Sequence, residues 1–322
     1  MIDRPRFADR WLVAVGGNAL ADPHDARDLA RQEEKAALLA VALADLLAVG
    51  IRLLIVHGNG PQVGARLIQG EAARQQVPPS PLHVCVAETQ GQMGHYLALA
   101  LVNEVRHRGL AVPVASLVTH VLVDPQAPEF QHPDKPVGPI HDEDEARRLV
   151  AERGWQMDRT ADGGWRRVVP SPRPLEVLER RAVERLLEDG FCVIAGGGGG
   201  VPLIEGEAGL RGVDVVVDKD YVAERLATAV GASRLIILTN VPGAALSFTG
   251  PQRRFLEEMT VEEAQMHLRR GEFAPGSMGP KVEACLEFLA AGGHEAVIAA
   301  TIDADAAFQG RAGTRIVARQ TL

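Results

Sequence analysis

The chain has 322 residues, of which 46% are hydrophobic and 24% are charged, a composition typical of one large globular domain or two smaller ones. A formal net charge of −8 disfavours a nucleic-acid partner, because nucleic-acid binding needs a basic face that displaces counterions. Charged residues interrupt every apolar run, and the charged N-terminus lacks the apolar core of a secretion signal. We therefore expect no membrane association and a cytoplasmic location. Three cysteines, none in a C-x-x-C pair, favour neither a disulfide scaffold nor a structural zinc site.

Apolar, β-branched runs alternate with helix-length segments along the chain. Strands are predicted at 11–16 and 51–57, with a helix at 26–49 between them and another at 82–108 after the second. Later runs predict further strands at 112–124, 191–197, 213–218, 234–240 and 295–300. Such runs indicate an α/β protein, a three-layer αβα sandwich around a mainly parallel sheet. Ligands of such sheets bind beyond the carboxyl ends of the strands.

Residues 121–170 interrupt this alternation. They are rich in proline and polar residues, and they contain a short charged helix at 142–153 and a possible hairpin at 155–169 with a D-G-G turn. A structureless loop of this length is unusual in a compact domain. We interpret the segment as a small protruding subdomain that could act as a lid.

Glycine and lysine are distributed unevenly. The 33 glycines cluster at predicted strand ends, where backbone can approach a ligand closely. Only four of the 34 basic residues are lysines, and Lys135, Lys219 and Lys281 all lie in turn-rich stretches. A compact ammonium reaches a phosphate or carboxylate where the planar arginine fork does not fit. We therefore expect these lysines to be functional.

The common phosphate-binding motifs are absent. No G-x-x-x-x-G-K-[ST] sequence occurs, which excludes a P-loop NTPase. The glycine runs at 58–60 and 196–200 both lack the third glycine of a dinucleotide-binding turn, and the protein-kinase motifs are missing. A nicotinamide-dependent dehydrogenase is therefore disfavoured.

Eight ordered motifs carry a resemblance to a known family. They are VAVGGNAL, HGNGPQVG, AETQGQMGHYLALAL, DKPVGP, RRVVPSPRP, VIAGGGGGVPLI, VDVVVDKDYVAERLA and FAPGSMGPKVEACLEF. Together they span about residues 11 to 300 and resemble the carbamate kinases of the amino acid kinase family. The resemblance implies the αβα fold, a homodimer, a protruding subdomain over the active site and a role in arginine metabolism. It also implies phosphoryl transfer between carbamate and ADP or ATP with Mg²⁺.

The resemblance divides the chain into three parts. Residues 1–120 and 171–205 would bind the acceptor, 121–170 would form the subdomain, and 206–322 would bind the nucleotide. The acceptor would lie against backbone amides at strand ends, which suit an anion. The expected acceptor residues are Gly16, Gly17, Asn18, Gly58, Asn59, Gly60, Gly196, Gly197 and Gly198. Because carbamate is already a nucleophilic anion, transfer needs positioning and charge neutralisation but no general base.

Lysines would neutralise the transferred group. Lys219 and Lys281 would bracket the phosphoryl oxygens, and Lys135 would reach in from the subdomain. Asp220 resembles the family's lysine-orienting aspartate and could also cap the following helix. We predict no metal site in the protein itself, since Mg²⁺ usually binds to the nucleotide phosphates with waters.

The predicted nucleotide site departs from the family pattern. Its residues are Lys219, Thr239, Asn240, Ala245, Ser277, Met278 and Lys281. Asn240 replaces an aspartate and Ala245 a tyrosine, which predicts weaker nucleotide binding unless Met278, Phe248 or Phe273 fills the gap.

Near the subdomain lysine, Asp134 replaces a threonine and His141 a tyrosine. These changes leave two alternatives open. One is a kinase of the same fold that acts on another small carboxylate or amino acid, and the other is a non-catalytic nucleotide or metabolite sensor.

Overall fold

The central sheet determines where the site can form. The computed structural model describes residues 9–20, 28–160, 162–248 and 252–318, and in these residues eight strands pair in the order β15-β17-β16-β12-β1-β2-β9-β3. Their bounds are Glu258–Thr260, Thr314–Val317, Glu295–Ala300, Arg234–Thr239, Arg10–Val15, Arg52–His57, Cys192–Ile194 and Val114–Ser116. Neighbours pair in parallel except β16 with β17, which confirms the mainly parallel sheet.

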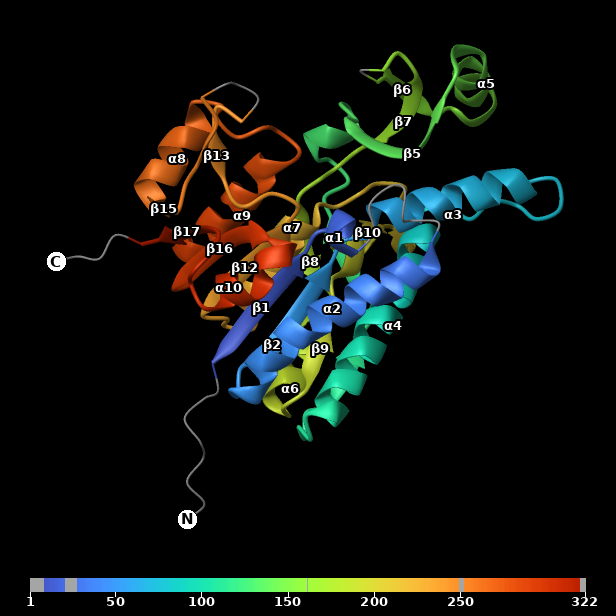
Figure 1. Ribbon diagram of the computed structural model, residues 1–322. Coiled ribbons are helices and arrows are strands. Elements are labelled where there is room, and N and C mark those ends of the chain that lie inside the picture. Colours follow the sequence, from blue (N-terminus) through green and yellow to red (C-terminus); the bar gives the residue numbers. More distant parts are fainter. Residues whose placement is uncertain (1–8, 21–27, 161, 249–251, 319–322) are drawn as a thin grey trace.

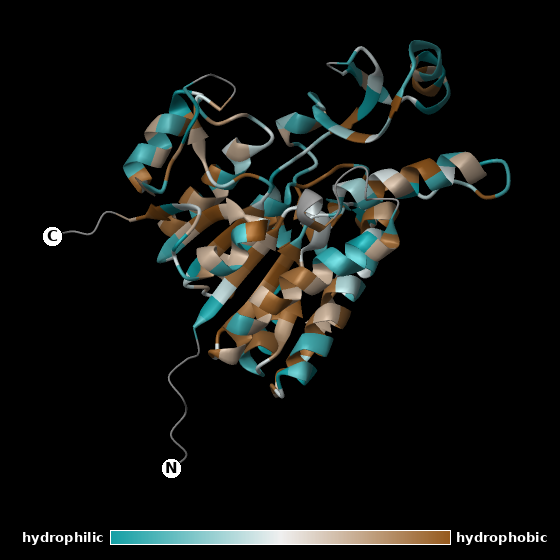
Figure 2. Cartoon of the chain, in the orientation of Figure 1, coloured by the Kyte–Doolittle hydropathy of each residue, from teal (hydrophilic) through white to brown (hydrophobic). Residues whose placement is uncertain are grey.

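Both faces of the sheet are buried because the strands are apolar on both sides. In β1, Leu12 and Ala14 pack into one core cluster, whereas Val13 and Val15 pack into the other. One face is covered by α2 (Leu29–Ala48), α4 (Leu82–His107) and α10 (Ala304–Phe308) (Figure 1). The other is covered by α6 (Arg180–Glu188), α7 (Lys219–Ala229), α8 (Val261–Arg269) and α9 (Met278–Ala290). The predicted αβα sandwich is confirmed, and Figure 2 shows its apolar strands between helices with polar outer faces.

Short elements complete the main domain. The helical turns are α1 (Gly17–Leu20), η2 (Pro128–Phe130), η3 (Gly197–Gly199) and η4 (Thr301–Asp303). A two-stranded sheet joins β13 (Ala245–Leu246) to β14 (Arg254–Phe255). Among the described residues, no helix is both long and apolar enough to cross a membrane.

A second sheet corrects one predicted strand. Its order is β11 (Gly209–Gly212), β10 (Val201–Gly206), β4 (His120–Val123) and β8 (Pro174–Val177). Residues 213–218, predicted as a strand, are not one. Val215 and Val217 are buried in the core, but the Val216 amide donates to the carbonyl of Pro170 (3.1 Å) rather than to a neighbouring strand. The valine run therefore reflects burial of an extended linker.

The protruding subdomain, residues 135–169, stands over α3 (Gly60–Ala73) (Figure 1). It contains β5 (Lys135–His141), α5 (Glu143–Arg153), β6 (Gln156–Arg159) and β7 (Trp165–Val169), so the predicted helix and hairpin are present. Residues 121–123 of the predicted segment lie instead in the second sheet. An apolar base formed by Val63 and Leu67 of α3 and Val137 and Val169 of the subdomain joins the two parts.

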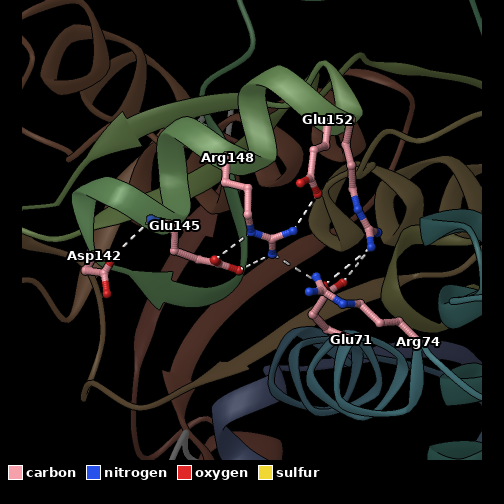
Figure 3. A network of polar contacts seen from close by, with 7 residues as sticks. Glu71, Arg74, Asp142, Glu145, Arg148 and Glu152 are labelled. Carbon is pink, nitrogen blue, oxygen red and sulfur yellow. Dashed lines mark hydrogen bonds and ion pairs between the residues drawn. The ribbon is translucent and has the colours of Figure 1, made fainter.

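Glu71, near the end of α3, links that helix to α5 (Figure 3). Its carboxylate pairs with Arg74 on its own side, and across the gap it lies 3.0 Å from Nη2 of Arg153 and 3.9 Å from Nη2 of Arg148. Arg148 is also held by Glu145 within α5. The network therefore fixes the outer end of the subdomain against the helix whose first residue, Gly60, belongs to the predicted acceptor site.

We expect Glu71→Gln to loosen this attachment. Removing the shared charge from partly exposed pairs should speed amide hydrogen exchange of residues 143–153 by about two- to fivefold, because such pairs contribute little individually. Mass spectrometry of the unliganded protein measures this. The control Glu88→Gln removes a pair that joins α3 to α4 through Arg66 (3.1 Å) and should leave this exchange unchanged. Equal rates in all three proteins would mean that the apolar base alone holds the subdomain.

Candidate functional site

A cavity of about 830 Å³ opens at the carboxyl ends of β1, β2 and β12, beneath the protruding subdomain. It is where a doubly covered parallel sheet is expected to bind a ligand. Most of the predicted site residues line it: Gly16, Gly17, Gly58, Asn59, Gly60, Lys135, Gly198, Lys219, Asp220, Thr239, Asn240, Ala245, Ser277, Met278 and Lys281. Segments from seven separate parts of the sequence thus meet in one space.

Two predicted acceptor residues, Gly196 and Gly197, do not line this cavity. The side chain of Asn18 lies outside the described part of the structure; its backbone belongs to α1, a single four-residue turn, so a helix dipole contributes less there than the sequence suggested. Gly196 and Gly197 lie behind the cavity wall. Gly196 has φ +67°, and a Cβ on Gly197 would come within 2.4 Å of Nε2 of His57. These two glycines are required by backbone conformation and internal packing.

Asp220 organises the charged end of the cavity. Its side chain is 2% exposed, and it accepts hydrogen bonds from Nζ of Lys219 (2.6 Å, Oδ1) and from Nζ of Lys281 (2.9 Å, Oδ2). Lys219 and Asp220 come from the first turn of α7, whereas Lys281 comes from the first turn of α9. One carboxylate therefore holds two ammonium groups from packed helices beside the same space.

Burial and charge act against each other in this group. Burial alone would raise the pKa of Asp220, but the two lysine charges outweigh it and hold that pKa well below its usual value. Burial lowers the pKa of Lys219, and the nearby charge of Lys281 adds to the effect. For Lys281 the desolvation cost is exceeded by attraction to Asp220, so its pKa is raised. The aspartate stays ionised and is a poor proton acceptor.

Asp218 is a site residue that the sequence reasoning missed. Its Oδ2 accepts a hydrogen bond from Nζ of Lys135 (3.0 Å), and its Oδ1 caps α7 by accepting from the amide of Asp220 (3.1 Å). The sequence had suggested Asp220 as the cap of this helix, but the structure shows that the cap is Asp218. The available signal was the D-K-D spacing, in which two carboxylates flank Lys219.

Arg166, in β7 of the subdomain, is a second missed residue. It lines the cavity, and its Nε donates to the carbonyl of Gly138 (2.9 Å). No carboxylate of the described chain pairs with it, and burial lowers its pKa. A half-buried guanidinium without a counter-ion favours an anionic ligand. The R-R-V-V run contained it, but only the fold shows which arginine turns inward.

The other end of the cavity is less polar. Ala245 is 3% exposed and lines the wall, as do Phe248, Phe273 and Met278, the three side chains named as possible replacements for the missing tyrosine ring. Phe273 is 4% exposed and packs edge-on against His267 with ring centroids 6.2 Å apart. This end can receive a flat aromatic group such as a nucleobase.

The carboxylates of the cavity bind lysine side chains of the protein and are not grouped as metal ligands. In the described ranges, no three His, Cys, Asp or Glu side chains are grouped as metal ligands. Asp218 and Asp220 are both engaged by lysines. A divalent cation at this site would need to bring other ligands with it, such as phosphate oxygens and waters.

A family model matches most of the chain. The model described as the amino acid kinase family covers residues 9–300. A carbamate kinase of Thermococcus kodakarensis is 44% identical over 311 residues, which cover 96% of this chain and 99% of the relative. A carbamate kinase of Clostridium perfringens is 40% identical over 310 residues, with 95% and 99% coverage.

Solved structures give the same result. The carbamate kinase of Giardia lamblia bound to AMP-PNP superimposes with a TM-score of 0.91 at 36% identity, covering 97% of this chain and 99% of that one. The similarity therefore includes the protruding subdomain as well as the central sheet.

His57, the last residue of β2, lies beside the two glycine loops, 58–60 and 196–200, that are the predicted acceptor loops. It is 2% exposed, and Nδ1 donates to the carbonyl of Gly58 (3.1 Å). Burial lowers its pKa to about 4, and this hydrogen bond opposes only part of the shift. The ring is therefore neutral near pH 7.

We expect His57 to make the fold sensitive to acid. As pH falls through about 6.5 the unfolded chain binds a proton at this residue, while the folded chain resists until about pH 4. The contribution of this residue to the free energy of unfolding is complete above pH 6.5 and is lost towards pH 4, and it amounts to about 3 kcal/mol. Between pH 7.5 and pH 5, the free energy of unfolding in urea should therefore fall by roughly 2 kcal/mol less in His57→Asn than in the unaltered protein. The exposed His95→Asn should follow the unaltered protein, and identical slopes in both variants would contradict the assignment.

Proposed function

This chain belongs to the amino acid kinase family, and we propose that it has carbamate kinase activity. The reaction is reversible phosphoryl transfer from carbamoyl phosphate to ADP, which gives ATP and carbamate. The observation that carries the proposal is the grouping of Lys135, Lys219 and Lys281 on two aspartates between the glycine loops and the apolar end.

The lysines and Arg166 would stabilise the transferred phosphoryl group. Charge spreads over its equatorial oxygens in the transition state, and preformed cations lower the barrier in a site that excludes water. Lys219 and Lys281 are held on Asp220 before substrate arrives, so little reorganisation is needed. Lys135 and Arg166 would approach from the subdomain side.

The acceptor would lie against the glycine loops. Gly16, Gly17, Gly58, Gly60 and Gly198 bring main-chain groups to the cavity wall. Carbamate carries its own negative charge, so its oxygen attacks phosphorus without losing a proton. The cavity agrees with this requirement, because Asp218 and Asp220 are bound by lysines and would be weak bases.

The nucleotide would extend towards the apolar end, with its base near Ala245 and Met278 and its phosphates near Lys219 and Lys281. Magnesium would enter as part of the nucleotide substrate, bound to phosphate oxygens and water. The corresponding parts of the chain are 1–120 with 171–205 for the acceptor and 206–322 for the nucleotide.

The segment 121–170 would act as a lid over the acceptor. Lys135 bridges to Asp218 at the junction with the main domain, and the Glu71 network holds the outer end. If these attachments break and re-form, the segment would open to admit substrate and then close over it. Closure would exclude water and so limit wasteful hydrolysis.

We also propose a cytoplasmic homodimer with a role in arginine metabolism, following the resemblance to carbamate kinases. For the dimer, the neighbouring helices α2 and α4 expose Leu38 (69%), Val41 (46%) and Leu99 (47%), apolar side chains that a second subunit could cover.

A coupled assay tests the activity. Purified protein with carbamoyl phosphate, ADP and Mg²⁺ should produce ATP at about 1 to 10³ turnovers per second, the usual range of enzymes. ATP consumption with a small carboxylate or an amino acid but not with carbamate would support a different acceptor instead. Nucleotide binding without turnover on any of them would indicate a sensor.

Removing either of the two lysine ammonium groups that Asp220 binds should abolish most turnover. Lys219→Ala and Lys281→Ala should each lower kcat by about 10²- to 10³-fold, because each ammonium acts mainly in the transition state. Arginine at either position should restore little, since its fork does not fit a point-charge contact. Lys35→Ala, outside the cavity, is the control and should remain active. Near-normal turnover in an arginine variant would refute the role assigned to lysine.

Nucleotide affinity should depend on Met278 rather than on a missing tyrosine. Because Phe248, Phe273 and Met278 already line the wall, Ala245→Tyr should not tighten ADP binding. Met278→Ala should weaken it about tenfold, equivalent to ~1.4 kcal/mol. Calorimetry measures both. Tighter binding by Ala245→Tyr would show that the base lacks an aromatic wall in the natural sequence.

A further inference from the structure

Thr89, in α4, determines how the Asn59 side chain is oriented. Thr89 is fully buried, and its Oγ1 lies 2.7 Å from the carbonyl oxygen of Cys85 and 2.9 Å from Nδ2 of Asn59. The carbonyl oxygen of Val86 lies 3.1 Å from the same hydroxyl. Carbonyls can only accept, so the single hydroxyl proton is directed to the carbonyls of Cys85 and Val86 within α4. Only a lone pair then faces Asn59. The Asn59 amide must therefore turn its NH₂ group towards Thr89 and its carbonyl oxygen away from it.

Gln90, the next residue, acts in the same way on the second acceptor loop. Its Nε2 donates to the Thr119 carbonyl (3.0 Å), and its Oε1 accepts from the Thr119 amide (3.1 Å) and hydroxyl (3.2 Å). Because the hydroxyl proton of Thr119 is used on Gln90, its lone pair accepts the amide of Gly196 (2.9 Å). Gln90 is 2% exposed and Thr119 is fully buried, so water does not compete.

The two loops also touch each other. A Cβ on Gly198 would lie 2.2 Å from Nδ2 of Asn59, and one on Gly197 would lie 3.0 Å from Cγ of Gln90. The main chain of the second loop is therefore packed directly on the side chains that α4 orients. A change in α4 reaches both loops together.

We propose that Thr89 and Gln90 are positioning residues that set the hydrogen-bond polarity of the acceptor end of the cavity. Neither side chain lines the cavity, whereas Asn59 and Gly198 do. The inference rests on the proposed function, because a carbamoyl group offers both an NH₂ donor and carbonyl acceptors. A site with one fixed arrangement of donors and acceptors favours one orientation of such a group and leaves other orientations unpaired.

Kinetics of matched variants test this. Thr89→Val keeps the shape but removes the lone pair, so the KM for carbamoyl phosphate should rise about tenfold while the ADP Kd stays within about twofold. Thr119→Val should raise this KM similarly, because it removes the oxygen that accepts the amide of Gly196. Thr89→Ser restores the hydroxyl and should return KM to within about threefold of the unaltered value. Should Thr89→Val not fold, Thr89→Cys, whose sulfur is a poor acceptor, replaces it.

Thr314→Val is the matched control. Thr314 is equally buried, and its hydroxyl accepts from the Ala244 amide (2.8 Å) on the nucleotide side. The variant should lose similar thermal stability without changing the KM for carbamoyl phosphate. An equal rise in KM in Thr314→Val and Thr89→Val, or failure of Thr89→Ser to restore it, would overturn the proposal.

A second measurement does not depend on turnover. In the ligand-free protein, hydrogen exchange at residues 57–63 and 196–201 should be several times faster in Thr89→Val and Thr119→Val than in Thr314→Val. Unchanged exchange in both loops would overturn the positioning role. Lack of turnover in the unaltered protein would instead refute the proposed function, so the two failures are distinguishable.

Discussion

The carboxylate of Asp220 is the interaction on which the charged end of the cavity depends. Two ammonium groups that are 12% and 15% exposed would repel each other and lose hydration without an anion between them. With Asp220 bridging, Lys219 and Lys281 can remain charged although burial acts against both. The bridge also joins the first turns of α7 and α9, whose packing forms much of one helical layer. The same contact therefore holds two helices together and keeps two buried lysines charged.

Asp218 extends this arrangement to the subdomain. A single side chain caps α7 and binds Lys135, so the start of the helix that carries Lys219 is tied to the first residue of β5. Any displacement of the subdomain that moves Lys135 must break or stretch this pair. Asp218 is 14% exposed, whereas Glu71 is 25% exposed and the lysine and arginine partners are similarly exposed, so the charge of Asp218 is less screened by solvent. The inner attachment should consequently be the stronger of the two.

Much of this arrangement follows from local sequence, and the rest depends on contacts between distant residues. Strands β1, β2, β9, β12 and β16 were predictable because each is buried along its length, as in 11–16, and the glycine clusters at 16, 58 and 196 marked strand ends. Strands β15 and β17, at one end of the sheet, were not predicted, because they are short and only partly buried. The valine run at 213–218 was misleading because burial and strand pairing give the same composition. Asp218 meets Lys135 across 83 positions, so the D-K-D spacing could mark the aspartate but not its partner. Arg166 turns inward only through the register of β7, which no short motif specifies.

The two ends of the cavity solve different electrostatic problems. At the phosphoryl end charge develops during transfer, and there cations held before binding stabilise the transition state more than the ground state. At the acceptor end the carboxylate charge is present in carbamate but not in the neutral carbamoyl group of carbamoyl phosphate, so a fixed cation there would favour bound carbamate and slow its release. Thr89, Gln90 and Thr119 are neutral and hydrogen-bonded, and His57 is held neutral by burial. Direction of hydrogen bonds, rather than charge, is what this end can use to select its ligand.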